Sequence, residues 1–95
     1  MEDNLFSGKL TTIQRLVREG NYVMTHHAFD EMIADDLRTR DVEQIIMSGS
    51  IIRVEIDKPG RERKYVIFGK SIDGSNAEVI AKIAGKVVII TVYLL

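Results

Sequence analysis

Two adjacent histidines, His26 and His27, are the side chains of this 95-residue chain best suited to acid–base chemistry. Histidine changes its charge near neutral pH, so it can give or take a proton under ordinary conditions. Cleavage of RNA without a metal needs a base for the 2′-hydroxyl, an acid for the leaving oxygen and a cation for the phosphate. The alternative is structural: His27 packs between a helix and a sheet with one ring nitrogen bonded to backbone, and His26 lies at the surface.

The cations for such a reaction are concentrated between Lys58 and Lys70. In a strand, Arg63 and Tyr65 point one way and Lys64 the other. The candidate catalytic residues are therefore His27, Arg63, Lys64 and Tyr93, with Arg53 and Tyr65 as candidate binding residues. Arg53 and Arg63 could hold one phosphate from adjoining strands, and tyrosine rings can stack on bases. The alternative is a solvated hairpin whose charges protect a sheet edge, with tyrosines that complete the core.

A metal centre is not expected. His27 and Glu31 are four residues apart and share a helix face, but zinc requires three or four ligands. A structural ion pair explains the same spacing. The chain has no cysteine, which excludes thiolate ligands and thiol nucleophiles. We therefore expect neither a metal nor another cofactor.

These residues are positioned by helices in the first half of the chain. A first helix is predicted from Leu10 to Gly20, with Thr11 or Thr12 as its N-cap, after a flexible start over residues 1–9. Residues 21–25 predict a brief strand, which we expect beside the last strand.

A second helix is predicted to begin at the N-cap Thr25. Its apolar face is Ala28, Phe29, Met32 and Ile33, and its solvated face is Asp30, Glu31, Asp35 and Asp36. A third begins near Thr39, buries Val42, Ile45 and Ile46, and ends at Gly49 in a left-handed conformation.

From residue 50 onward the hydrophobic period changes to two, which is typical of strands. Ile52, Val54 and Ile56 predict the buried side of a first strand. Strands over residues 62–70, 77–84 and 86–95 follow after short turns, which favour antiparallel pairing. The sequence predicts an α+β fold, with two or three N-terminal helices packed on one face of a mostly antiparallel four- to five-stranded sheet.

Composition indicates one domain over residues 1–95, since 45% of the residues are hydrophobic. The start does not resemble a signal peptide, and the longest apolar run, residues 87–95, is too short to span a bilayer as a helix. We therefore expect a cytoplasmic protein without membrane contact. A net charge of −1 argues against broad non-specific binding to nucleic acid but permits a local basic patch.

A set of short motifs resembles a widespread bacterial and archaeal family of small domains of unknown function. The matching residues are His27-Ala28, Glu31-Met32, Asp36-Leu37, Asp41-Val42, Gly49, Arg63-Lys64-Tyr65, Gly69, Asp73-Gly74 and Thr91-Val92-Tyr93. Glu31 and one of Asp35 or Asp36 are acidic where relatives often carry arginine. The resemblance therefore does not make this helix a source of cations for a phosphate.

The order of helices and strands is also remotely similar to RelE-like toxins, in particular the MqsR-type messenger RNA endonucleases. That similarity implies an RNA-acting domain, with RNA or an antitoxin-like protein as its partner. The alternative is a non-catalytic dimerisation or partner-binding module, with a homodimer formed through the C-terminal strand, where Leu94 and Leu95 end the sequence. The RNA-acting function would be favoured if one concave surface held Arg53, Arg63, Lys64, Tyr93 and a histidine.

Overall fold

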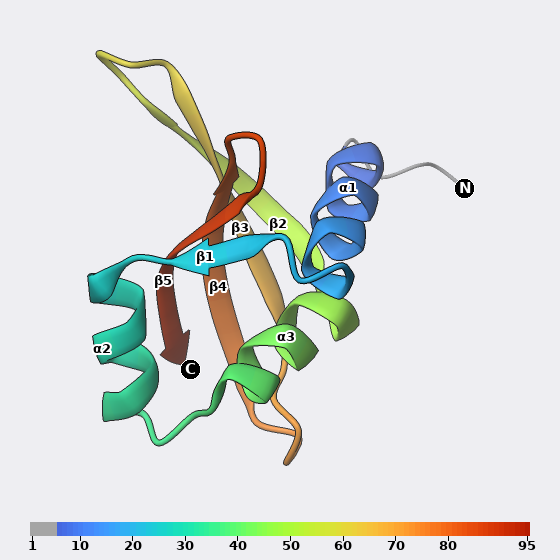
Figure 1. Cartoon of the computed structure of the whole chain (residues 1–95), viewed down its shortest axis with the longest axis vertical. Coiled ribbons are helices and arrows are strands. Elements are labelled where there is room, and N and C mark those ends of the chain that lie inside the picture. The colour runs from blue at the N-terminus through green and yellow to red at the C-terminus, as the bar shows by residue number, and fades with distance from the viewer. Residues whose placement is uncertain (1–5) are drawn as a thin grey trace.

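A computed structural model describes residues 6–95 (Figure 1). Within these residues, three helices and five strands follow one another. They are α1 (Ser7–Arg18), β1 (Tyr22–Met24), α2 (His26–Ala34), α3 (Thr39–Ser48), β2 (Ser50–Asp57), β3 (Glu62–Lys70), β4 (Asn76–Ile83) and β5 (Val87–Leu94). Within the described residues no helix is long and apolar enough to cross a membrane.

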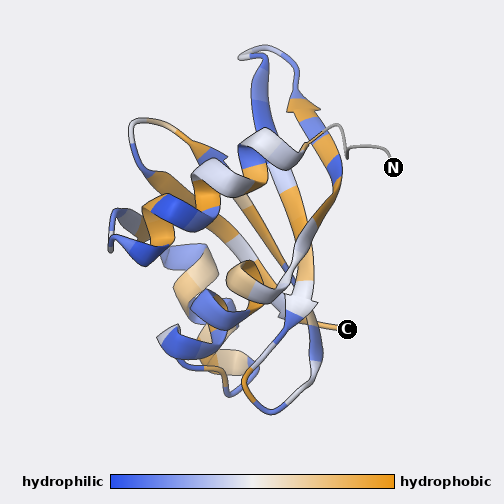
Figure 2. Cartoon of the chain, turned by 90° about the vertical axis from the view of Figure 1, so that its right-hand side faces the viewer, coloured by the Kyte–Doolittle hydropathy of each residue, from blue (hydrophilic) through white to orange (hydrophobic). Residues whose placement is uncertain are grey.

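The five strands form one mixed sheet in the order β1-β5-β4-β3-β2. The last four strands are antiparallel neighbours, whereas β1 pairs with β5 in parallel, with Tyr22 opposite Val87. The three helices lie on one side of this sheet (Figure 2). The expected α+β fold is confirmed, and so is the expected position of the short strand beside the last one.

Local capping explains where the helices begin and end. Thr25 is the N-cap of α2, since its hydroxyl accepts a hydrogen bond from the Ala28 N–H at 3.1 Å. Gly20 terminates α1 in the left-handed region, at φ +76°. The predicted start of α1 is wrong, because the helix already begins at Ser7; residues 1–5 of the expected flexible start lie outside the described residues. Thr39 is the first residue of α3 rather than its N-cap.

The core fills the space between the helices and the covered face of the sheet. Its fully buried members include Ile13 from α1, Ile45 and Ile46 from α3, and Ile67 and Ile89 from the sheet. Ridges of branched side chains from both layers interdigitate here, and their removal from water is the main force that holds the layers together.

Two glycines allow α3 to lie directly on β3. A Cβ atom at Gly69 would be 2.0 Å from the Ile45 carbonyl oxygen, and one at Gly49 would be 2.6 Å from the same oxygen. Gly49 has an extended backbone, at φ −99°, so the predicted left-handed conformation is wrong. This position needs glycine because two backbones approach closely, not because the helix ends in a left-handed turn.

The outer face of α2 differs from the predicted one. Ala28 and Met32 are buried, but Phe29 and Ile33 are 49% and 57% exposed. The acidic side is not simply solvated, because the Glu31 carboxylate accepts the Val92 N–H at 3.0 Å and Asp35 accepts the Leu94 N–H at 2.9 Å. Since β1 is only three residues long, none of the described strands pairs with the second half of β5 on that side. The α2 carboxylates take the place of the missing strand.

The hairpin of β2 and β3 extends past the helices (Figure 1). Ile52 and Ile56 are 46% and 57% exposed, against the predicted buried side of this strand, whereas Ile51 is buried in the core. The strand also changes register between Ile51 and Arg53, which marks a β-bulge at that point.

Candidate functional site

The face of the sheet turned away from the helices carries a cluster of polar side chains. Residues directly opposite each other in antiparallel strands share a face, so the register assigns them. On this face lie Arg53, Glu55, Lys64, Val66, Phe68, Glu78, Ile80, Lys82, Thr91 and Tyr93. We call this surface the uncovered face.

Glu78 and Tyr93 lie at its centre as direct neighbours on β4 and β5. Glu78 is only 8% exposed, although no helix covers it. The Tyr93 hydroxyl donates a short hydrogen bond to its carboxylate. A carboxylate held at this depth is unusual, because burial of a charge is unfavourable without a hydrogen-bonding partner.

Arg53 reaches the same hydroxyl from β2. Its guanidinium interacts with the Tyr93 hydroxyl and lowers the pKa of Tyr93, whereas Glu78 raises it. The pKa of Tyr93 is nevertheless raised, first by the hydrogen bond to Glu78 and then by burial and the negative charge of Glu78. Tyr93 therefore stays protonated well above neutral pH, beside both a carboxylate and a cation.

The cations of the uncovered face are also paired with acids. The Arg53 Nε atom is 3.3 Å from Glu55, and the Lys82 Nζ atom is 2.8 Å from Glu62. Lys64 Nζ is 4.0 Å from Asp57. Pairs of this kind at a protein surface contribute about 0–1 kcal/mol, so a ligand can displace them.

The structure brings together three of the six residues that the sequence singled out. Arg53, Lys64 and Tyr93 share the uncovered face. Arg63 and Tyr65 lie on the covered face, where they line a hollow with Lys9 and Thr12 of α1. Arg53 and Arg63 therefore point to opposite sides of the sheet and do not hold one phosphate together.

His27 lies on α2, outside the cluster. Its side chain is 66% exposed, and its Nε2 atom is 3.3 Å from the Glu31 carboxylate that also accepts the Val92 N–H. It is not packed between helix and sheet, as the structural alternative required. Tyr93 follows Val92 in β5, so Glu31 connects the histidine to the strand that carries Tyr93.

Sequence reasoning missed Glu78, the most buried member of the cluster. It stands in an alternating strand pattern where an acid is expected to face solvent. Only the register of β4 against β5 shows that Tyr93 lies opposite it. Among the described residues there is no group of three or more histidine, cysteine, aspartate or glutamate side chains that could hold a metal ion.

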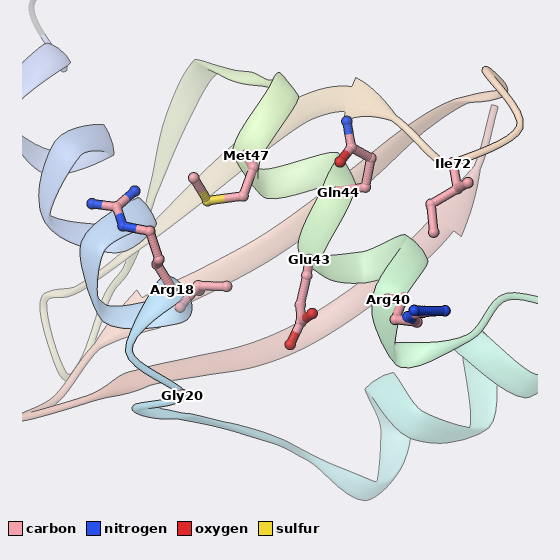
Figure 3. A pocket seen from close by; sticks show the side chains of 8 residues that line it. Arg18, Gly20, Arg40, Glu43, Gln44, Met47 and Ile72 are labelled. Atoms are coloured by element: carbon pink, nitrogen blue, oxygen red, sulfur yellow. The ribbon is translucent and has the colours of Figure 1, made fainter.

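A second hollow, of about 690 Å³, lies between the end of α1 and α3 (Figure 3). Arg18, Arg40 and Glu43 line it, and none of the six expected site residues does. The Tyr22 hydroxyl donates a short hydrogen bond to Glu43 there. Burial, together with this bond and the charge of Glu43, raises the pKa of Tyr22 to about 12.

Residues 24–94 match the model of a protein family described as a domain of unknown function (DUF4258). Comparison with curated proteins and with solved structures gives no match. None of these comparisons shows a relationship to RelE-like or MqsR-type toxins. The matched segment runs from the end of β1 to the end of β5 and contains the whole Arg53, Glu78 and Tyr93 cluster. The chain therefore belongs to the DUF4258 family, as its sequence motifs predicted.

Proposed function

We propose that this domain binds single-stranded RNA on its uncovered face and cleaves it with Arg53, Glu78 and Tyr93. The observation that carries the proposal is the contact of one hydroxyl, that of Tyr93, with a nearly buried carboxylate and a guanidinium. These three groups supply a base, an acid and a cation, which are the requirements for cleavage without a metal.

In the proposed reaction the RNA 2′-oxygen attacks the adjacent phosphorus, and its proton passes to the Glu78 carboxylate. The bond from phosphorus to the 5′-oxygen breaks, and that oxygen takes the Tyr93 proton. The products are a 2′,3′-cyclic phosphate and a 5′-hydroxyl. The hydrogen bond between the two side chains then returns a proton from Glu78 to Tyr93. Arg53 stabilises the negative charge that develops on the phosphate.

Lys64 and Phe68 support binding on the same face. Lys64 contributes a second positive charge, and the Phe68 ring offers a surface on which a base can stack. With about two phosphates neutralised, the binding constant for single-stranded RNA should fall with salt at a logarithmic slope of roughly −1.4. Such weak binding agrees with the net charge of −1.

The test is cleavage of an unstructured RNA oligonucleotide by the purified chain, with and without ribosomes, and with identification of the product ends. We expect Glu78→Gln and Tyr93→Phe each to slow cleavage by about 100-fold or more, which is the usual contribution of a general acid or base. Lys86→Ala, in the turn between β4 and β5, is the matched control and should cleave normally. The same sequence in DNA lacks the 2′-hydroxyl and should remain intact.

The residues proposed from sequence alone are tested in the same assay. Loss of cleavage in His27→Ala or Arg63→Ala, with full activity in Glu78→Gln, would assign the chemistry to those residues instead. RNA left intact by the unaltered chain, both alone and with ribosomes, would refute the nuclease proposal.

The second candidate is a non-catalytic partner-binding module, and exposed apolar residues favour it. Leu94 and Leu95 are 37% and 65% exposed at the end of β5. Because α2 carboxylates already accept the Val92 and Leu94 N–H groups, an antitoxin-like partner or a second copy would contact side chains here rather than add a strand. Binding that is lost in a Leu94→Ser, Leu95→Ser variant, together with absence of RNA cleavage, would favour this function.

A further inference from the structure

The outer edge of β2 is the longer free edge of the sheet. One side of β2 pairs with β3, and no other described strand lies beyond it. β2 has eight residues, whereas β1 at the opposite edge has three. A free edge presents unpaired backbone N–H and C=O groups, and these can pair with another chain.

The side chains along this edge are of two kinds, one on each side of the strand. Val54 and Ile56 lie on the covered side, whereas Ile52 is the extra residue of the β-bulge, and both isoleucines are about half exposed. Arg53 and Glu55 lie between them, on the uncovered face, and pair with each other at 3.3 Å. Val54 packs partly against the core, whereas Ile56 is 57% exposed.

The charge pattern of β2 is self-complementary when the β2 strands of two copies pair antiparallel with their Val54 residues directly opposite each other. Arg53 of one copy then lies opposite Glu55 of the other. The same pair occurs twice because of the two-fold symmetry. A register centred on Arg53 or Glu55 would instead place two like charges directly opposite each other, which is destabilising.

We propose that β2 of one chain pairs with β2 of a second copy in this register, so that two five-stranded sheets become continuous. The β-bulge between Ile51 and Arg53 lies at one end of the contact and leaves residues 53–57 regular. The interface differs from the one expected at the C-terminal strand, because β5 lies inside the sheet and α2 occupies its remaining edge.

Charge reversal tests the proposed register. Sedimentation equilibrium of the whole chain should show a dimer that Arg53→Glu or Glu55→Arg weakens at least tenfold, because each change places like charges opposite each other twice. The double variant restores opposite charges and should return the dimer constant to within a few-fold of the unaltered value. Lys86→Glu is the control and should have no effect. A monomeric unaltered chain at millimolar concentration, or a double variant as weak as the single ones, would overturn the proposal.

A cross-link provides a second test that leaves Arg53, Glu78 and Tyr93 unaltered. The chain has no cysteine, so Val54→Cys introduces its only thiol. Residues directly opposite in antiparallel strands have Cα atoms about 4.5–5.5 Å apart, which a disulfide can span. Mild oxidation should therefore convert the variant to a covalent dimer at low protein concentration. Ile72→Cys, at a position 61% exposed, should remain monomeric. Equal cross-linking of both variants would contradict the register, and neither outcome depends on RNA cleavage.

Discussion

Gly69 has no room for a methyl group, so its substitution tests whether the backbones of α3 and β3 approach each other closely at this position. An added Cβ atom would be 2.0 Å from the Ile45 carbonyl oxygen, which is backbone and cannot rotate away. We expect Gly69→Ala to lower the free energy of unfolding by about 3 kcal/mol, since overpacking forces the backbone to shift. Gly60→Ala is the control, because no atom lies within 4 Å of its Cβ position. Equal urea midpoints for the two variants would contradict the close approach.

Tyr22 determines how the protein responds to strong alkali. Its pKa is raised from 10.0 to about 12, so between these values the unfolded chain loses the proton while the folded chain keeps it. Its contribution to stability is therefore fully present below pH 10 and decreases as the pH rises to about 12. Tyr22→Phe should show a smaller loss of stability over that interval. Glu43→Gln removes the charge and should lower the pKa of Tyr22, measured by phenolate absorbance.

At the level of single residues, the sequence predicted part of the candidate site. Arg53 and Tyr93 were recognised by their chemistry, and both belong to the cluster. Glu78 was not recognised, because alternation places an acid in solvent unless a cross-strand partner lies over it. Arg63 was grouped with Arg53 because residues of adjoining strands were expected to meet. The register places these two arginines on opposite faces.

Among the elements, α2 has a role that its amphipathic pattern did not reveal. Its acids close the open edge of β5 through the Val92 and Leu94 N–H groups. Val92 is fully buried, so Glu31→Ala should leave its N–H without an acceptor and cost about 1–3 kcal/mol. Glu31→Gln keeps a carbonyl acceptor and should cost less.

Amide hydrogen exchange provides the measurement for this edge. Exchange at Val92 should become faster in Glu31→Ala and change little in Asp30→Ala, which alters an exposed neighbour on the same helix. Unchanged protection at Val92 in the Glu31→Ala variant would show that the carboxylate does not support the strand.

The sequence predicted the types of elements that local signals determine. It did not predict the burial of residues whose exposure depends on the overall shape of the molecule. The Thr25 cap and the Gly20 terminus follow from short-range hydrogen bonding, and both were predicted. Ile52 lies at a β-bulge directly after the buried Ile51, and Ile56 lies on the protruding hairpin; alternation indicates neither. Gly49 was assigned to a left-handed turn because the neighbouring backbone of β3 is nineteen or more residues away in sequence.

Considered as a whole molecule, the fold depends on β5. This strand pairs with β1 in parallel and with β4 in antiparallel, so it joins the two ends of the sequence in one sheet. Its residues Val87, Ile89 and Val92 are fully buried in the core that all three helices share. The tip of the β2–β3 hairpin, residues 55–64, contributes no member to that core, so its backbone amides should exchange through local opening.

A single shared core predicts that the molecule unfolds in one step. Ile89→Ala should lower the free energy of unfolding by about 2–5 kcal/mol, since it creates a cavity where β5 meets β1 and β4. Ile72→Ala, at an exposed turn position, should change it by less than about 0.5 kcal/mol. Tyrosine fluorescence and far-ultraviolet circular dichroism should give coincident urea transitions in both variants. Transitions that separate only in Ile89→Ala would show that the β2–β4 meander stays folded after β1 and β5 have separated from it.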